Sequence, residues 1–383
     1  MEIQSRTTLV RKRERAFFST DQGKPVGSQT AYIGLDVHSK TSTITWMDSE
    51  GKVQETDTFE TSERNLIEGV QQIEARTKKA TLEESPLAFW TARALTSGVD
   101  EVLVCDPREN RLISRSIRKG DEPDAKALAR LLRMGELKEV YQPANDQRAL
   151  YKQACSHYMD LRDQQRSLKQ KIKSRLKRWG HLHIPGAEVF SQSGREAYLV
   201  ELSHDRIREQ VESLYDLLDK MHAEKKAACR QFLELGRRYQ ETQEFQKIPG
   251  IGPISAHTFD AYIQTPHRFA TKQKLWRYPK LGVQKHSSGG TRVRREKLDP
   301  AGHGELKALS HRAVKEALGG EDKNEVQASY RASLQRTGDK THARLDTQRK
   351  LLSTMWGLWK SGTAYNPKLF YHSKRSRVTE SSG

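Results

Sequence analysis

The sequence predicts an α/β region followed by mainly helical regions, and three observations support this fold class. Short apolar runs alternate with helical patterns from Tyr32 to about Leu137, which is typical of a sheet covered by helices. Long, charged stretches with spaced leucines follow between about 145 and 239, and they indicate extended helices. Helical patterns then continue to about Lys360. The length of 383 residues permits two or three domains with a sizeable core.

Three consecutive strands begin the α/β region. They are predicted at Ile33–Val37, Thr43–Met47 and Lys52–Phe59. The elements that follow are a helix near Glu63–Ala75, a strand that ends at Glu83, a helix over Pro86–Leu95 and a strand over Glu101–Cys105. This order of strands and helices is that of an RNase H-like mixed sheet with helices.

Two acidic residues lie at or near the ends of predicted strands. Asp36 closes the apolar run Ala31–Leu35, so its carboxylate would project from a mostly buried strand. Glu83 ends a second short run, Ala80–Leu82. A buried strand is an unfavourable place for a charge without a partner. Both acids are therefore candidate ligands, although an acid near the end of a strand can also have a purely structural role.

Two further acids, Asp121 and Asp124, stand where a helix over Ala125–Leu132 should begin. Their spacing of three puts both carboxylates on one face of that helix, and both also suit helix capping, which is the structural alternative. Hard divalent cations such as Mg²⁺ take oxygen ligands from carboxylates, phosphate and water. A two-ion site can hold both the attacking and the leaving oxygen of a phosphoryl transfer. The joint arrangement with Asp36 and Glu83 therefore predicts a metal site.

The charge balance indicates a nucleic-acid partner. The chain has 67 Lys and Arg against 49 Asp and Glu, a formal net charge of +18, and such an excess favours nucleic acid or another anionic surface as the partner.

No apolar stretch approaches about 18 residues, and Met1–Arg15 is polar, so we expect neither a membrane span nor a secretory signal. The three separated cysteines, Cys105, Cys155 and Cys229, are typical of a reducing compartment. We therefore expect a cytoplasmic protein.

A basic segment lies in the predicted helical arms, which are expected to be antiparallel and partly coiled-coil, with a break around Gly180–Ser193. From Arg166 to Arg178 the sequence has many cations and no acid, whereas a solvated helix face usually mixes charges of both signs. We predict that this segment binds nucleic-acid phosphates. The candidate contacts are Arg166, Lys169, Lys173, Arg175 and Lys177.

A glycine-rich turn follows the arms. Gly250 and Gly252 lie in the stretch Ile248–Ala256, which leads into an apolar helix. In helix-hairpin-helix modules such glycines let backbone N–H groups approach a DNA phosphate, so both glycines are candidate nucleic-acid contacts. A tight turn between helices without a ligand is the alternative. Another helix is predicted over Ala270–Val283.

A segment with serines, glycines and arginines comes next and is predicted to be flexible. Ser287 and Ser288 precede Gly289–Gly290, and a serine hydroxyl becomes an effective nucleophile when nearby cations or a metal stabilise its attack. A Ser-Ser-Gly-Gly loop is usually only a flexible turn. The cations that follow it, which are also candidate nucleic-acid contacts, are Arg292, Arg294 and Arg295.

Several of these motifs occur in a characteristic order along the chain. They are Gly34–His38, Leu82–Ser85, Gly120–Ala125, Ile248–Gly252 and Ser288–Gly289. This order resembles the DEDD insertion-sequence transposases, which are bridge-RNA-guided serine recombinases whose N-terminal half is similar to a Holliday-junction resolvase. The similarity runs from about Tyr32 to Phe370.

The resemblance implies a DNA transposase that uses two catalytic centres. By motif match, Ser288 of a C-terminal transposase domain would attack DNA and form a covalent phosphoserine intermediate. Ser287 adjoins it, and the serine directly before glycine is preferred. Glu84 likewise adjoins Glu83, and the end of the strand favours Glu83. The implied Mg²⁺ ligands are Asp36, Glu83, Asp121 and Asp124.

The resemblance also implies partners. A structured guide RNA would pair with element ends and target DNA, and the protein would read RNA shape and backbone. The two centres would form a composite site across subunits, in a dimer that assembles into a tetramer, with the helical arms as dimerisation elements. The implied parts are a flexible basic arm, an RNase H-like catalytic domain, helical arms, the transposase domain and a disordered basic tail. Their ranges are 1–28, 29–144, 145–240, 241–370 and 371–383.

Two other functions share some of these features. A metal-dependent, structure-specific endonuclease would use the same carboxylates with water as the nucleophile, and it would not need Ser288. A nucleic-acid-binding scaffold would use the acids only structurally. Substitution of Ser288 and of the carboxylates distinguishes the three hypotheses.

Overall fold

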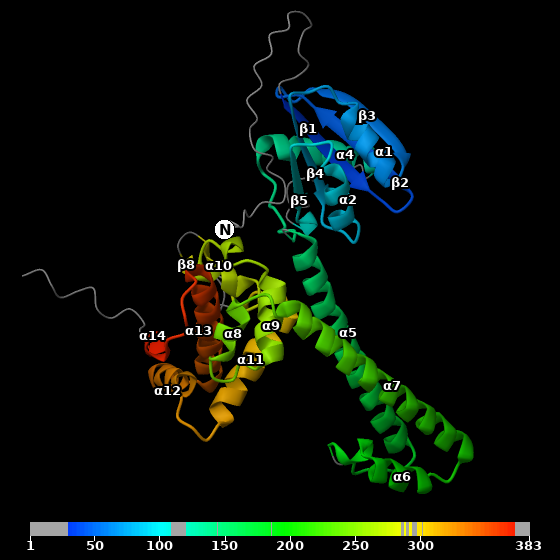
Figure 1. Cartoon of the computed structure of the whole chain (residues 1–383), viewed down its shortest axis with the longest axis vertical. Coiled ribbons are helices and arrows are strands. Elements are labelled where there is room, and N and C mark those ends of the chain that lie inside the picture. The colour runs from blue at the N-terminus through cyan, green and yellow to red at the C-terminus, as the bar shows by residue number, and fades with distance from the viewer. Residues whose placement is uncertain are drawn as a thin grey trace, which may run out of the picture. The chain divides into compact units, whose positions relative to one another are not determined.

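The computed structural model describes residues 30–108, 120–143, 145–184, 186–284, 287–288, 291–292, 297–300 and 302–371. It has two compact units, Met1–Asn145 and Asp146–Gly383, which are described separately (Figure 1). The predicted N-terminal arm, 1–28, and nearly all of the predicted tail, 371–383, lie outside the described residues. Among the described residues, none of the helices has the length and apolar character needed to cross a membrane.

A five-stranded mixed sheet is the centre of the first unit. Its strands are β1 (Thr30–Val37), β2 (Thr41–Met47), β3 (Val53–Glu60), β4 (Thr77–Glu83) and β5 (Glu101–Cys105). The order in the sheet is β3-β2-β1-β4-β5; β2 runs antiparallel to both neighbours, and β1, β4 and β5 are parallel. The predicted RNase H-like α/β class is thus confirmed for this part of the chain.

Apolar residues on one face of the sheet pack against two helices, α1 (Glu63–Gln71) and α2 (Ala88–Leu95). Ile33 and Leu35 belong to this core and are fully buried. Successive strand residues point to opposite faces, so Gly34 and Asp36 share the other face. The helix on that second face is α4 (Asp121–Met134), which contacts β1, β2 and β4.

Helix α4 lies directly on the backbone of β1, because Gly34 has no side chain. A Cβ atom at Gly34 would be 2.0 Å from the carbonyl oxygen of Ala125 and 2.5 Å from the amide nitrogen of Ala129. No other residue type leaves room for such a close approach. The helix ends at Gly135, whose φ of 70° is the left-handed conformation typical of a helix C-terminus.

The second unit begins with two long antiparallel helices, α5 (Asp146–Arg178) and α7 (Asp205–Gly236), which lie side by side (Figure 1). At the far end of the pair they pack with η1 (Glu188–Phe190) around a small apolar core, and α6 (Gln192–Val200) contacts both α7 and η1 there. The members of that core include Leu168, Ile172, Leu176, Val211 and Leu218. Leucine and isoleucine at helical spacing therefore hold the pair together.

The rest of the second unit is mainly helical, which confirms the predicted class. The α-helices are α8 (Glu241–Gln246), α9 (Pro253–Ile263), α10 (Lys272–Arg277), α11 (Gly304–Gly319), α12 (Glu325–Thr337), α13 (Lys340–Ser361) and α14 (Pro367–Tyr371), with the 3-10 turn η2 (Pro266–Arg268). Short strands lie between α10 and α11: β6 (Val283–Gln284), β7 (Ser287–Ser288), β8 (Thr291–Arg292) and β9 (Lys297–Leu298).

One large core joins the C-terminal helices to the near ends of α5 and α7. Tyr151 of α5 stacks on Phe232 of α7, with ring centroids 5.4 Å apart, and both side chains are fully buried in that core. The near ends of the arms therefore share their packing with the C-terminal helices. The predicted boundary between arms and transposase domain stays a prediction.

The predicted helix over Ala270–Val283 is wrong. Helix α10 covers only Lys272–Arg277. Pro279 follows it and has no N–H to continue the helical hydrogen bonds, and Lys280 has a φ of 58°. Val283 is instead in strand β6, where it pairs with Leu298.

Candidate metal centre

Two of the predicted acids lie at the carboxyl ends of neighbouring parallel strands, Asp36 as the next-to-last residue of β1 and Glu83 as the last residue of β4. In the register of β1 and β4, Leu35 pairs with Leu82, so the residues that follow them, Asp36 and Glu83, are adjacent across the sheet. Neighbouring strands lie about 4.8 Å apart, and paired residues point to the same face. Glu83 is also paired with Cys105 of β5. The sheet thus places both acids at its carboxyl edge.

The other two acids reach this edge through α4. Because α4 lies on Gly34 at Ala125, the first turn of the helix is near the end of β1, where Asp36 stands. That first turn contains Asp121 and Asp124. The close approach at Gly34 is therefore what brings the two sequence regions together.

The carboxylates are close enough to affect one another's ionisation. Burial raises the pKa of Asp36, the nearby His38 lowers it, and the carboxylates of Asp121 and Asp124 raise it further. Like charges that affect one another in this way favour a bound cation between them.

One atom each from Asp36, His38 and Asp121 forms a compact group. The Nε2 atom of His38 is 3.4 Å from Oδ2 of Asp36 and 3.9 Å from Oδ1 of Asp121. The three potential ligand atoms all lie within 4.8 Å of one another. Carboxylate oxygens with one imidazole nitrogen are suitable ligands for a divalent ion.

Glu83 and Asp124 are outside this group of three. The neighbour Glu84 accepts a hydrogen bond from Nε2 of Gln142 at 2.7 Å, and its own N–H donates to the carbonyl of Cys105 at 2.9 Å. The strand register with Asp36 therefore favours Glu83 over Glu84 as a ligand, and the assignment stays a prediction.

His38 lies in the motif Gly34–His38, but the sequence alone does not identify it as a ligand. The feature that could have indicated a ligand is its position two residues after Asp36. That spacing alone is weak evidence, because His38 follows the end of β1 and the direction of its side chain depends on the turn to β2.

The predicted nucleophile lies in the second unit. Ser288 is in β7, where it pairs with Thr291 of β8, and Ser287 pairs with Arg292. The flanking Gly289–Gly290, with the predicted contacts Arg294 and Arg295, lie outside the described residues. The structure thus gives the serine segment a hairpin pairing, and the role of Ser288 stays a prediction.

The predicted basic segment of α5 has contacts within its own unit. Nζ of Lys173 donates to the carbonyl of Gly186 at 3.0 Å, and it lies 5.5 Å from the ring centre of Phe190, which Lys169 approaches at 4.7 Å. These two lysines line a hollow of about 300 Å³ together with Arg166, which pairs with Asp163 at 3.3 Å.

Further along the segment, Arg175 donates to Gln210, and Lys177 is exposed. Most of the candidate lysine and arginine side chains thus contact other residues of the arm. Phosphate binding by this segment stays a prediction.

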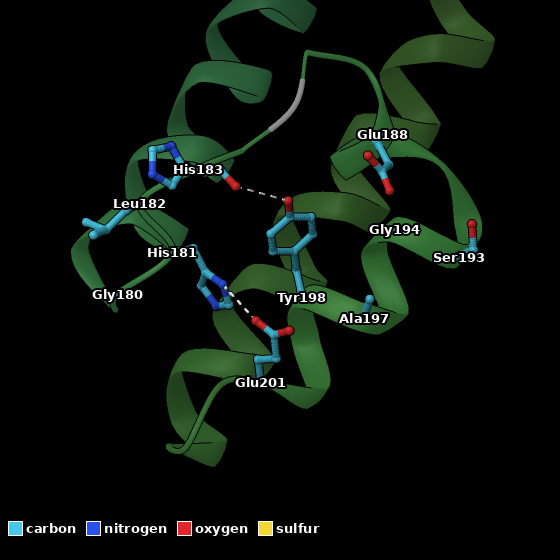
Figure 2. Close-up of a pocket in the computed structure, with 10 residues that line it drawn as sticks. All are labelled: Gly180, His181, Leu182, His183, Glu188, Ser193, Gly194, Ala197, Tyr198 and Glu201. Carbon is cyan, nitrogen blue, oxygen red and sulfur yellow. Dashed lines mark hydrogen bonds and ion pairs between the residues drawn. The ribbon is translucent and has the colours of Figure 1, made fainter.

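Another hollow, of about 570 Å³, lies at the far end of the arms (Figure 2). Nδ1 of His181 is 3.1 Å from Oε2 of Glu201, and the hydroxyl of Tyr198 donates to the carbonyl of His183 at 3.4 Å. None of the residues predicted for catalysis or binding lines this hollow.

The two glycines before α9 differ in their surroundings. A Cβ at Gly250 would be 2.1 Å from the carbonyl oxygen of Ala313, and its φ is 84°, so packing on α11 alone explains this glycine. Gly252 is exposed at the N-terminus of α9 and has open space around it. The suggested phosphate contact therefore depends on Gly252 more than on Gly250.

Comparison with known families agrees with this geometry. A transposase family model of the DEDD type matches residues 33–180, which include all four predicted acids. A second model, described as transposase IS116/IS110/IS902 family, matches residues 242–331, which include Ser288 and both glycines. A search of curated proteins found no match to the chain.

The fold, the acidic edge and these matches define a transposase, an enzyme that acts on DNA. More narrowly, the chain belongs to the DEDD insertion-sequence transposases of the IS110 family. This family implies a divalent metal, and the group of Asp36, His38 and Asp121 is suited to hold one.

Proposed function

We propose that this transposase cuts and rejoins element and target DNA with Mg²⁺ and a covalent phosphoserine intermediate. One observation carries the metal-dependent part: oxygens of Asp36 and Asp121, from distant parts of the sequence, converge within 4.8 Å. Convergence of carboxylates at the edge of a sheet is a costly arrangement without a cation, because like charges repel.

The carboxylates of Asp36, Glu83, Asp121 and Asp124 would hold the ion. Oxygen donors of this kind match the preference of Mg²⁺, which keeps several waters and takes the remaining ligands from carboxylates and phosphate. When bound, Mg²⁺ would neutralise charge on the scissile phosphate and on the leaving oxygen. The protein contributes a fixed donor geometry, since two ligands come from a buried sheet and two from a helix packed on it.

Ser288 would be the nucleophile and would hold the cut DNA strand covalently until it is rejoined. Its Oγ attacks phosphorus, a P–Oγ bond forms, and the bond from phosphorus to a deoxyribose oxygen breaks. The serine proton goes to a base, and the leaving oxygen takes up a proton. Rejoining reverses these steps with the hydroxyl of the new strand, so no phosphodiester is lost to water. The neighbouring cations Arg292, Arg294 and Arg295 would stabilise the phosphate charge.

A structured guide RNA would choose the DNA. Base pairing then supplies sequence specificity, and the protein needs mainly contacts to backbone phosphates. The net charge of +18 and the basic segment of α5 support such binding. The assembly would contain several copies in the cytoplasm, a dimer that forms a tetramer, in which the serine of one copy serves the carboxylates of another.

Trapping of the protein–DNA adduct tests the proposal. Ser288→Ala should abolish the adduct and strand exchange but leave RNA binding intact, whereas the matched control Ser287→Ala should keep both activities. If Ser288→Ala and Ser287→Ala both still cut DNA without a covalent adduct, water is the nucleophile and the protein is a structure-specific endonuclease. If the double variant Asp36→Ala and Asp124→Ala keeps strand exchange, the carboxylates have no catalytic role.

A further inference from the structure

A histidine lies beside the two converging carboxylates, and it is not one of the four acids of the family motif. We propose that Nε2 of His38 is a third protein ligand of the ion held by Asp36 and Asp121. We further propose that this nitrogen strengthens the binding of Mn²⁺ more than the binding of Mg²⁺. The inference rests on the proposed metal site and adds a ligand and a selectivity to it.

The distances fit a shared ion. Two ligands at right angles around an ion about 2.1 Å from each lie about 3 Å apart. Nε2 of His38 is 3.4 Å from Asp36 and 3.9 Å from Asp121, so a small closing movement of the side chains would bring all three to one ion. A simple ion pair between His38 and Asp36 would not require the carboxylate of Asp121 nearby.

The backbone of His38 is held by hydrogen bonds. Its N–H donates to the carbonyl of Thr41 at 3.0 Å across the turn from β1 to β2. Its carbonyl accepts a hydrogen bond from the hydroxyl of Thr61 at 2.7 Å, and the N–H of Thr61 donates to the carbonyl of Lys40 at 2.9 Å. The end of β3 thus fixes the turn that carries the imidazole, and a fixed ligand binds with a smaller loss of entropy.

The side chain is also accessible to an ion. His38 is 60% exposed, while Asp36 is 22% exposed, so the carboxylate forms the floor of the site and the imidazole lies toward solvent. An ion could therefore reach the group without movement of the sheet or of α4.

The ligand type decides the selectivity. Mg²⁺ strongly prefers oxygen ligands and gives up its waters reluctantly. Imidazole nitrogen binds transition ions better, and affinities rise from Mn²⁺ along the first-row series. One nitrogen among carboxylate oxygens should therefore strengthen binding of Mn²⁺ more than binding of Mg²⁺.

Electron paramagnetic resonance of Mn²⁺ bound to the untagged full-length chain tests this ligation directly. Echo modulation from a coordinated ¹⁴N should be present in the wild-type protein and absent in His38→Ala, whose Kd for Mn²⁺ should rise at least about tenfold. The Kd for Mg²⁺ should rise less. His38→Asp, which supplies an oxygen, should restore ion binding without the nitrogen modulation.

Two controls separate this inference from the proposed function. His311→Ala, which removes an exposed histidine of the second unit, should keep the nitrogen modulation. If Mn²⁺ binds the wild-type chain without nitrogen modulation, and Asp36→Asn abolishes that binding, the metal site stands and the role of His38 is refuted. If Asp36→Asn leaves Mn²⁺ binding unchanged, the proposed metal site itself fails.

Discussion

A single methyl group added at Gly34 should disrupt the metal centre by displacing α4, the helix that carries Asp121 and Asp124. In Gly34→Ala the new Cβ would be 2.0 Å from the carbonyl oxygen of Ala125 and 2.5 Å from the nitrogen of Ala129. Both contacts are with backbone atoms of α4, so no side-chain rotation can relieve them. The helix must move away from β1.

The size of that movement follows from the contact distances. A Cβ needs at least 3.0 Å from such an atom, so α4 must move by at least about 1 Å. Overpacking of this kind lowers the free energy of unfolding by about 1–3 kcal/mol. The movement also carries Asp121 and Asp124 away from Asp36, so the affinity for a divalent ion should fall.

Thermal unfolding with and without Mg²⁺ measures both effects. At a free concentration one hundred times its Kd, a bound ion adds about 2.7 kcal/mol to the free energy of unfolding, and Gly34→Ala should lose most of this gain. The matched control is Gly120→Ala, just before α4, where a Cβ would make only ordinary contacts of 3.6 Å or more with Pro123. This control should behave as the wild type.

One result would refute the reasoning. If Gly34→Ala unfolds at the wild-type temperature and is stabilised by Mg²⁺ to the same extent, the close packing of α4 on β1 does not position the ion ligands. A variant that loses stability but keeps the full Mg²⁺ effect would show that the packing matters only for the fold.

Three other predictions concern the second unit. Burial raises the pKa of Asp260 above its ordinary value of about 4, although the ion pair with Arg148 at 2.8 Å opposes the shift; between the ordinary and the raised pKa, the folded state therefore keeps a proton that the unfolded chain loses. The free energy of unfolding should fall as pH rises between these values, and Asp260→Asn should flatten this slope in urea titrations at several pH values. Gly250→Ala should lower the unfolding temperature, since its Cβ would be 2.1 Å from Ala313 oxygen, whereas Gly252→Ala should not. When Ala replaces Lys169, Lys173 and Arg175 together, the RNA affinity should depend less steeply on salt concentration. An unchanged slope would exclude phosphate contacts by these three residues.

Local patterns were sufficient to predict much of the α/β unit. Strand Glu101–Cys105 has the predicted bounds, and β4 ends at Glu83 as expected, because short runs of β-branched and apolar residues bounded by polar ones specify strands locally. The predicted helix over Ala270–Val283 is wrong because α10 ends at Arg277, and Pro279 has no N–H to continue the helical hydrogen bonds.

The strand register was not predicted, although it decides which acids are neighbours. The end of the predicted strand favours Glu83 over Glu84, but only the pairing of Leu35 with Leu82 places Glu83 beside Asp36. A shift of one residue would turn every side chain of the strand to the other face. Register depends on contacts between distant segments, so a local pattern cannot supply it.

The sequence by itself determined the types of element, their order and the acids at their ends, because propensity and periodicity act over a few neighbouring residues. Only the tertiary structure decided that Asp36, His38 and Asp121 converge. Their convergence follows from the short turn after β1, which carries His38, and from the long-range packing of α4 on Gly34. Contacts between segments far apart in the chain create the donor geometry, and no single segment contains it.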